Sequence, residues 1–257
     1  MYDIHMAEAS REFAECWKAA GIHLENQAQG PIQSWLRAHL NPPFLEHLSF
    51  RLGNQLFFVR LEDVDGKLET PGTLQGLLSI ADGCSGHACL MPMKKSWGGW
   101  KPSGRGWGLV DARTGKEVVP PELISDEPIE MTDWELLDFA VQVVRQKLEE
   151  EGREIMSWQS NPSVDPSIWF VGEQGPEWVV VRAVRYPSKS AAIPSNIEAV
   201  AQRCSGLSSL GNFASVAFAN ADDPFDPMAE QNGNYIPILR GHGTKVFYSG
   251  IAPVWGR

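Results

Sequence analysis

Leu56-Phe57-Phe58-Val59-Arg60 is a run of apolar, β-branched and aromatic residues that ends in arginine, and Trp178-Val179-Val180-Val181-Arg182 repeats this pattern. A second apolar run precedes each one, Leu48-Ser49-Phe50 in the first place and Ile168-Trp169-Phe170-Val171 in the second. A glycine-containing turn separates the two runs in both places. Two such runs around a glycine turn are typical of a β-hairpin. The sequence therefore predicts the same hairpin twice.

The segments after the two predicted hairpins also correspond. A helix start with proline comes next, at Pro71 and Pro194, and each helix runs into Cys-Ser-Gly, at 84–86 and 204–206. A strand, a long connection and a closing hairpin then follow in both copies, and the expected ranges are 88–93, 94–107 and 108–119 in the first copy and 213–218, 220–234 and 236–248 in the second. The order predicts a tandem duplication of a helix–β-hairpin–helix–strand–hairpin module. The fold class is α+β, with mostly antiparallel sheets flanked by helices.

A helix is expected before each hairpin. The second helix is marked by the capping-box residues Thr132 and Glu135, by an apolar stripe at helical spacing and by Gly152 at its end. The first is shorter, from Pro31 to about Leu40, and an extra amphipathic helix at 7–20 ends at Gly21. We therefore expect an N-terminal helical segment at 1–30, a first module at 31–123 and a second at 124–257, which together could form one compact unit with approximate twofold symmetry.

Composition restricts the possible partners and the compartment. The chain has 257 residues, four cysteines and a net charge of −10, which argues against nucleic acid and favours a basic protein partner. Four cysteines are too few for a disulfide scaffold, so we expect a reduced, cytoplasmic setting. The N-terminus has no signal-peptide pattern, and no apolar run is long enough to cross a membrane. We expect a soluble protein with no membrane partner, and a homodimer is one possible state.

The second hairpin resembles the core hairpin of the PD-(D/E)XK nuclease fold. The matching residues are Asp165 at the start of one strand and the run from Glu177 to Arg182 in the next. That family completes a metal site with an acid-x-Lys triplet, but the corresponding triplet here is Arg182-Ala183-Val184. Without the acid and the lysine, Mg²⁺ has no second carboxylate and water has no activator. The resemblance therefore implies a related hairpin without nuclease chemistry. Arg60 and Arg182 are expected to be structural cations, each paired with an acid of its own copy.

No catalytic, metal or cofactor motif is complete. Cys84, His87 and Cys89 lie close in sequence, but they lack a fourth ligand and a zinc-type spacing. Cys84 or Cys204 would need a histidine base to act as a nucleophile, and the one candidate, His242, is expected in an exposed turn. The shared Cys-Ser-Gly is interpreted as a packing element at a helix end. We therefore expect no catalytic residues, no metal and no cofactor.

The two long connections differ most between the copies. The first, 94–107, is basic and rich in tryptophan, and the second, 220–234, is acidic. The basic loop could bind bases or sugars, the acidic loop could hold a cation, or the two could attract each other within the chain or across a dimer. At least one of the three tryptophans should be packed or bound. The candidate ligand-binding residues are Lys94, Lys95, Trp97, Trp100, Lys101, Arg105 and Trp107, and the acidic-loop residues are Asp222, Asp223, Asp226 and Glu230.

These observations favour a non-enzymatic binding or interaction protein that engages a basic protein, as an immunity protein or a secretion chaperone would. The alternative is a ligand-binding, nucleic-acid-binding or enzymatic protein with a degenerate nuclease-like fold. Its site would be the basic loop 94–107 or the seam between the modules, where pockets are commonly found.

Overall fold

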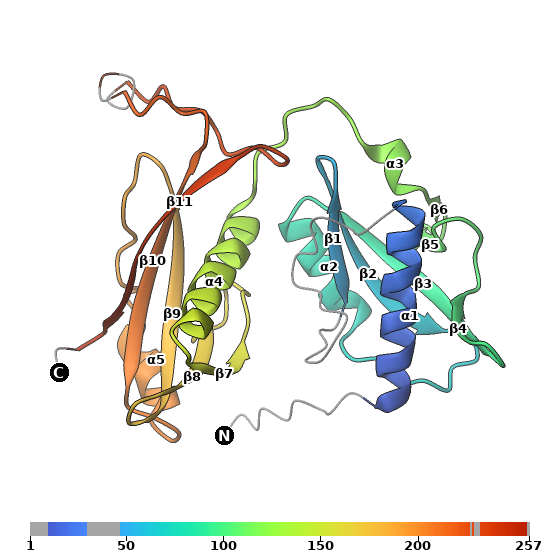
Figure 1. The fold of residues 1–257 in the computed structure, drawn as a ribbon, viewed down its shortest axis with the longest axis horizontal. Coiled ribbons are helices and arrows are strands. Elements are labelled where there is room, and N and C mark those ends of the chain that lie inside the picture. The colour runs from blue at the N-terminus through green and yellow to red at the C-terminus, as the bar shows by residue number, and fades with distance from the viewer. Residues whose placement is uncertain (1–9, 30–46, 227, 229–231, 256–257) are drawn as a thin grey trace. The chain divides into compact units, whose positions relative to one another are not determined.

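The fold was analysed in a computed structural model, which describes residues 10–29, 47–226, 228 and 232–255. The chain divides into two compact units, unit 1 at Met1–Glu127 and unit 2 at Pro128–Arg257. The described part is mixed α+β, with five helices and two sheets whose strands are mostly antiparallel (Figure 1). The expected helix at 31–40 lies outside the described residues.

Unit 1 contains one sheet with a helix against each face. Its strand order is β1-β2-β3-β5-β6, with β4 paired to β3, and only β2 and β3 run parallel. The helix α2 connects these two parallel strands. The elements are α1 (Arg11–Gln27), β1 (Leu48–Leu52), β2 (Gln55–Asp63), α2 (Leu74–Gly83), β3 (His87–Ser96), β4 (Gly99–Pro102), β5 (Leu109–Asp111), β6 (Glu117–Val118) and α3 (Pro120–Leu123).

The core of unit 1 forms between α1 and the sheet. Phe13 and Trp17 of α1 are buried and pack in one cluster with Phe57 and Val59 of β2. The expectation that the extra amphipathic helix at 7–20 ends at Gly21 is wrong, because α1 continues to Gln27 and Gly21 lies buried inside it. Leu24, one turn further on, extends the same apolar stripe, and its burial outweighs the roughly 1 kcal/mol that an internal glycine costs.

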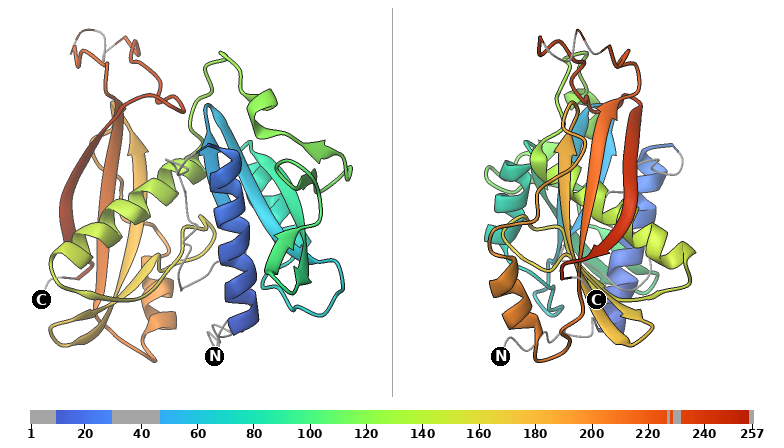
Figure 2. Two further views of the ribbon diagram at one scale, coloured as in Figure 1. Left: turned by 45° about the vertical axis from the view of Figure 1, so that its right-hand side comes forward. Right: turned by 90° about the vertical axis from the view of Figure 1, so that its left-hand side faces the viewer.

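Unit 2 contains a second sheet. As in unit 1, a β-hairpin is followed by a helix and then by a strand parallel to the hairpin's second strand. The strand order is β11-β10-β9-β8-β7, and only β9 and β10 run parallel, connected by α5. Figure 2 shows α4 and α5 on opposite faces of this sheet. The elements are α4 (Asp133–Glu150), β7 (Glu154–Trp158), β8 (Ile168–Gly172), β9 (Gly175–Arg185), α5 (Ile197–Cys204), β10 (Gly211–Asn220) and β11 (Thr244–Pro253).

Alternation along β9 divides the core of unit 2 between the two helices. Val179 and Val181 belong to the cluster that contains the buried stripe of α4, whereas Trp178 and Val180 pack with Val200 and Cys204 of α5. This is the two-residue period of a strand that is buried on both faces. The expected capping box of α4 is confirmed, since Thr132 and Glu135 cap each other reciprocally.

A buried ion pair connects that cap to the segment before β11. Arg240 is 3% exposed and donates to both carboxylate oxygens of Glu135, with Nε–Oε1 and Nη2–Oε2 distances of 2.9 and 2.8 Å. The same carboxylate accepts hydrogen bonds from the backbone N–H and the hydroxyl of Thr132. One glutamate thus caps a helix and neutralises a buried arginine.

The structure confirms three of the four expected hairpins. Those at 48–59 and 168–182 are confirmed, as is the closing hairpin of the first copy, where β5 pairs with β6. The closing hairpin expected at 236–248 is wrong. There, β11 pairs with β10, and Leu239 forms only an isolated bridge to Glu130. Pro237 has no N–H to donate to a strand ladder, and its carbonyl oxygen accepts instead from the side chain of Asn220.

Candidate functional site

The basic segment 94–107 is not an open loop. Its first part extends β3 and folds back as β4, with Ser96 opposite Gly99 and Lys95 opposite Trp100. The turn between them consists of Trp97 and Gly98, and Gly99 then adopts a φ of +94°, which a residue with a side chain rarely takes. We call residues 94–107 the basic hairpin. The side chains of 94–96 and 99–102 are therefore presented by paired strands, and 103–107 follow them as an irregular segment.

The three tryptophans of the basic hairpin have different environments. Trp100 and Trp107 are each 6% exposed and belong to the core of unit 1, where the ring of Trp107 stacks on Phe50 with centroids 6.4 Å apart. The prediction that at least one tryptophan is packed is therefore confirmed. Trp97, at the tip, is fully exposed. Two tryptophans hold the hairpin, and the third is left in solvent.

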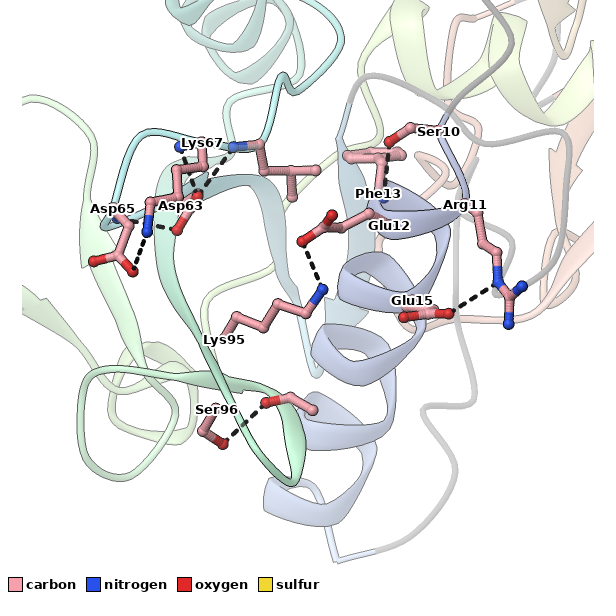
Figure 3. Close-up of polar contacts among 12 residues, drawn as sticks. Ser10, Arg11, Glu12, Phe13, Glu15, Asp63, Asp65, Lys67, Lys95 and Ser96 are labelled. Carbon is pink, nitrogen blue, oxygen red and sulfur yellow. Dashed lines mark hydrogen bonds and ion pairs between the residues drawn. The ribbon is translucent and has the colours of Figure 1, made fainter.

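Lys95 fixes the same hairpin to α1. Its Nζ atom lies 2.8 Å from Oε1 of Glu12, as Figure 3 shows, and 5.9 Å from the centroid of the Trp100 ring. The hydrogen bond to Glu12 raises the pKa of Lys95 above its ordinary value. Lys95 is therefore a structural cation that remains charged at neutral pH. Of the four basic side chains expected in the site, this one already has a partner.

Lys94 and Lys101 lie on the other face of the hairpin. They are directly opposite each other across β3 and β4, and both are exposed. Neither forms an ion pair with a described residue, and the same holds for exposed Arg105. Like charges at directly opposed positions destabilise a strand pair. The fold therefore gains nothing from placing two lysines here, and their charge remains available to an external anion.

Replacing Lys101 with glutamate should stabilise the protein. We expect the free energy of unfolding to rise by about 0.5 kcal/mol, because a like-charge cross-strand pair with Lys94 becomes an opposite-charge pair. Urea denaturation followed by far-UV circular dichroism measures this change. Lys189→Glu, an exposed substitution in unit 2 with the same charge change, is the control and should give no gain. A loss of stability in Lys101→Glu would show that Lys101 supports the fold.

The described carboxylates of the acidic segment 220–234 do not form one group. Asp222 and Asp226 are exposed, but Asp223 is buried and accepts hydrogen bonds from the backbone N–H groups of Phe225 and Ile236. Asp223 therefore has a structural role in shaping the loop. Glu230 lies outside the described residues.

The nuclease-like hairpin carries an ion pair in place of a metal site. Arg182 donates to both carboxylate oxygens of Asp165, at 2.9 and 2.6 Å, and Asp165 is almost wholly buried. The expected pairing of Arg182 with an acid is confirmed. The same expectation for Arg60 is wrong, because Arg60 donates to the hydroxyl of Thr70 and the carbonyl of Pro71. In unit 2 the carboxylate that a nuclease would use is thus neutralised by an arginine.

The cysteines lie in surroundings that disfavour the reactive thiolate. All four are buried and none forms a disulfide, and burial raises the pKa of Cys16 and Cys89 to about 12 and that of Cys204 to about 11. His87 hydrogen-bonds Gln55, with Nε2 and Oε1 3.0 Å apart, and His242 is exposed in its turn. Within the described ranges, no three histidine, cysteine or acidic side chains are grouped so as to hold a metal ion.

One hollow was not anticipated from the sequence. It has a volume of about 280 Å³ and lies in unit 2 near the end of α4. Its walls combine apolar side chains with three carboxylates and one arginine. The lining residues are Leu148, Glu151, Arg153, Phe170, Glu173, Glu177, Asn212, Ile251 and Pro253. These residues come from four separate segments, so no local sequence pattern marks them.

The comparisons with known proteins include a match to a protein family. No curated protein and no solved structure matches the chain, and in the described part no helix has the length and apolar character needed to span a membrane. The match covers most of unit 2 and less than half of the chain. Residues 134–254 are similar to a family described as a domain of unknown function, DUF8840.

Proposed function

We propose that this chain is a non-enzymatic binding protein that docks a partner through the basic hairpin. One observation carries the proposal: Trp97 is fully exposed at the tip of a hairpin whose other two tryptophans are buried in the core. Tryptophan and arginine are the residues that most often dominate binding energy at protein interfaces. A tryptophan left in water on a fixed support is the arrangement that such an anchor requires.

The hairpin is well suited to docking because its geometry is set before binding. The β3–β4 pairing, the buried rings of Trp100 and Trp107 and the contact between Lys95 and Glu12 all hold it in place. A side chain presented on a fixed support loses little conformational entropy when it binds, which improves affinity. Trp97 therefore needs only its own rotamer fixed by the partner.

The charges of the hairpin define the partner surface as anionic. Lys94 and Lys101 lack acidic partners among the described residues, and an anion would relieve their mutual repulsion. The whole chain carries a net charge of −10, so an extended polyanion would be repelled away from the hairpin. A local acidic patch on a protein supplies an anion to the two lysines without bringing an extended polyanion near the acidic chain. Nucleic acid and anionic membranes supply anions only as such extended polyanions.

Three labelled probes test the proposal: a peptide of alternating glutamate and leucine, a deoxythymidine oligonucleotide and phosphatidylserine vesicles. We expect the peptide to bind, and its affinity to fall as salt is raised, because salt screens exposed charges. Lys94→Glu/Lys101→Glu and Trp97→Ala should each weaken binding by about tenfold, which corresponds to about 1.4 kcal/mol. Lys189→Glu/Arg203→Glu, with the same charge change on exposed residues of unit 2, should bind normally.

The alternative outcomes are also informative. Stronger hairpin-dependent binding of the oligonucleotide or the vesicles would replace the protein partner with that class. Absence of any binding that depends on the hairpin would contradict the proposal.

A basic protein is the second candidate partner, as for an immunity protein or a chaperone. The hollow in unit 2 supports it, because Glu151, Glu173 and Glu177 line it together with apolar walls and one cation, Arg153. A lysine or arginine side chain could lay its aliphatic stem on those walls and its charge near the carboxylates. We expect binding of a labelled polylysine peptide to weaken in Glu151→Gln/Glu173→Gln and to be unchanged in Glu149→Gln/Glu198→Gln. Equal binding by both variants would remove this candidate.

We also propose that the two units derive from a duplication. The strand registers support it, since β2 and β3 pair Phe57 with His87, and β9 and β10 pair Val179 with Asn212. Two residues before Phe57, Gln55 hydrogen-bonds His87, and two residues before Val179, Glu177 hydrogen-bonds Asn212 at 2.9 Å. The same cross-strand polar contact thus occurs at the same register in both units.

A pair of glycines supports the same correspondence. By strand register the counterpart of Gly86 is Gly211 and not Gly206 of the shared Cys-Ser-Gly. Gly86 and Gly211 each directly precede the pairing residue just described, and a Cβ atom on either would meet a side chain of the neighbouring strand. In unit 1 the crowding atoms belong to Leu56 and Phe58, and in unit 2 they belong to Trp178. Leu56 and Trp178 hold matching positions in the two repeated strand sequences. The units differ in charge in the connections after β3 and β10, one of which is basic and the other acidic.

A further inference from the structure

The connection after β10 in unit 2 carries an exposed surface of its own. Three large apolar side chains are largely open to solvent here: Met228 at 64% and Tyr235 at 43% in the connection, and Phe247 at 50% in the adjoining strand β11. Two exposed carboxylates, Asp222 and Asp226, belong to the same connection. We call these five residues the acidic aromatic patch. Exposed apolar side chains gathered in one region commonly mark an interaction surface.

The support of this patch is ordered by ring contacts. The Phe225 ring lies edge-on to Tyr186 and to Phe247, with centroids 5.1 and 6.2 Å apart. The Nζ atom of Lys245 lies 4.3 Å from the centroid of the same ring. The buried carboxylate of Asp223 accepts hydrogen bonds from the backbone N–H groups of Phe225 and Ile236. These two bonds hold the early and the late part of the connection to the same side chain. The patch, like the basic hairpin, is presented on a defined framework.

We propose that the occupant of this patch is the basic hairpin of a second copy of the chain, so that the protein assembles with itself. The inference rests on the proposed function of the hairpin and names its partner. Trp97 of one copy packs against Tyr235 and Phe247 of the other. Lys94 and Lys101 then face the carboxylates of Asp222 and Asp226.

Chemical complementarity favours this occupant. The hairpin offers an exposed ring with unneutralised cations, and the patch offers exposed rings with carboxylates that have no ion-pair partner among the described residues. Aromatic rings pair favourably at offset or edge-on geometry, and opposite charges orient the approach.

The hairpin and the patch are different surfaces of one chain, so a contact between them is heterologous. When a twofold axis relates two copies, the contact forms twice and the pair closes as a dimer. Each contact contributes equally, and losing either side of it removes both contacts at once. The dimer should be sensitive to salt, because exposed charges contribute to both contacts.

Sedimentation equilibrium from micromolar to high-micromolar concentration tests the inference on the full chain. We expect the unmodified chain to dimerise, and Trp97→Ala, Lys94→Glu/Lys101→Glu and Asp222→Lys/Asp226→Lys each to raise the dimer dissociation constant by at least about tenfold. The four-residue variant Lys94→Glu/Lys101→Glu/Asp222→Lys/Asp226→Lys should dimerise again, because the hairpin is then acidic and the patch basic, and their charges remain complementary. Lys189→Glu/Arg203→Glu should dimerise normally, and circular dichroism confirms that each variant is folded.

Two results would overturn the inference. One is an unmodified chain that remains monomeric throughout the concentration range. The other is a folded four-residue charge exchange that fails to dimerise although the unmodified chain does. If the chain is monomeric but the glutamate–leucine peptide still binds through the hairpin, only the self-assembly fails. If neither occurs, the docking role of the hairpin fails as well.

Discussion

Replacing Arg240 with methionine should lower the free energy of unfolding of unit 2 by about 3–5 kcal/mol, because it leaves the Glu135 carboxylate buried without its cation. Glu135 is 8% exposed and receives two hydrogen bonds from Arg240. The same carboxylate caps α4, so the loss extends to the start of that helix. No other described ion pair is buried on both sides to this degree.

Urea denaturation, followed by tryptophan fluorescence and circular dichroism, measures the effect. With two units in one chain, the unfolding curve can show two transitions, and only one should shift. The double variant Arg240→Met/Glu135→Leu should recover much of the loss, since an apolar pair can replace a buried ion pair at little cost. Arg145→Met, at an ion pair where Glu149 is half-exposed, is the control and should cost far less. An Arg240→Met variant as stable as the unmodified chain would mean that the pair contributes nothing.

Gly211→Ala should destabilise unit 2 by about 3 kcal/mol, the upper part of the range for overpacking a core. A Cβ atom at this position would overlap Cζ2 of the Trp178 ring. The Trp178 ring is fully buried against α5, so it cannot move aside without disturbing Val200 and Cys204. The added methyl group therefore displaces either the ring or the start of β10.

Gly206→Ala is the matched control, because nothing lies within 4 Å of its added Cβ, and its free energy of unfolding should change little. Adding Trp178→Leu to Gly211→Ala should recover part of the loss, since leucine occupies the corresponding place in unit 1, at Leu56 beside Gly86. Thermal melts of the unmodified chain and of the three variants measure the loss in Gly211→Ala and its partial recovery in Gly211→Ala/Trp178→Leu. A Gly211→Ala variant as stable as Gly206→Ala would show that the ring has room to move.

Local patterns in the sequence predicted the elements that depend on local interactions. The capping box and apolar stripe predicted α4 because both signals lie within the helix. The same holds for the hairpins around Gly53 and Gly175, where the turn and the two strands adjoin. The strand β7 was missed, because Glu154–Trp158 is short and only partly buried, so its apolar residues do not alternate clearly.

Features that depend on distant segments could not be predicted in this way. The composition of 94–107 identified a basic, tryptophan-rich segment, but the burial of Trp100 and the anchoring of Lys95 depend on α1, and Lys95 and Glu12 are 83 positions apart. Arg240 and Glu135 are 105 positions apart. Neither contact leaves a local pattern, so which cations are structural and which remain available for binding became clear only in the fold.

Each unit is one unbroken stretch of chain, and this affects the order of events during synthesis. All the strands that pair in the sheet of unit 1 are encoded before Pro128. At about 5–20 residues per second, translation of unit 2 takes roughly 10 seconds, which exceeds the milliseconds-to-seconds folding times of small mixed domains. The first sheet can therefore close on the ribosome before the similar strands β9 and β10 exist to compete for its edges, which protects a chain that contains two resembling hairpins from mispairing.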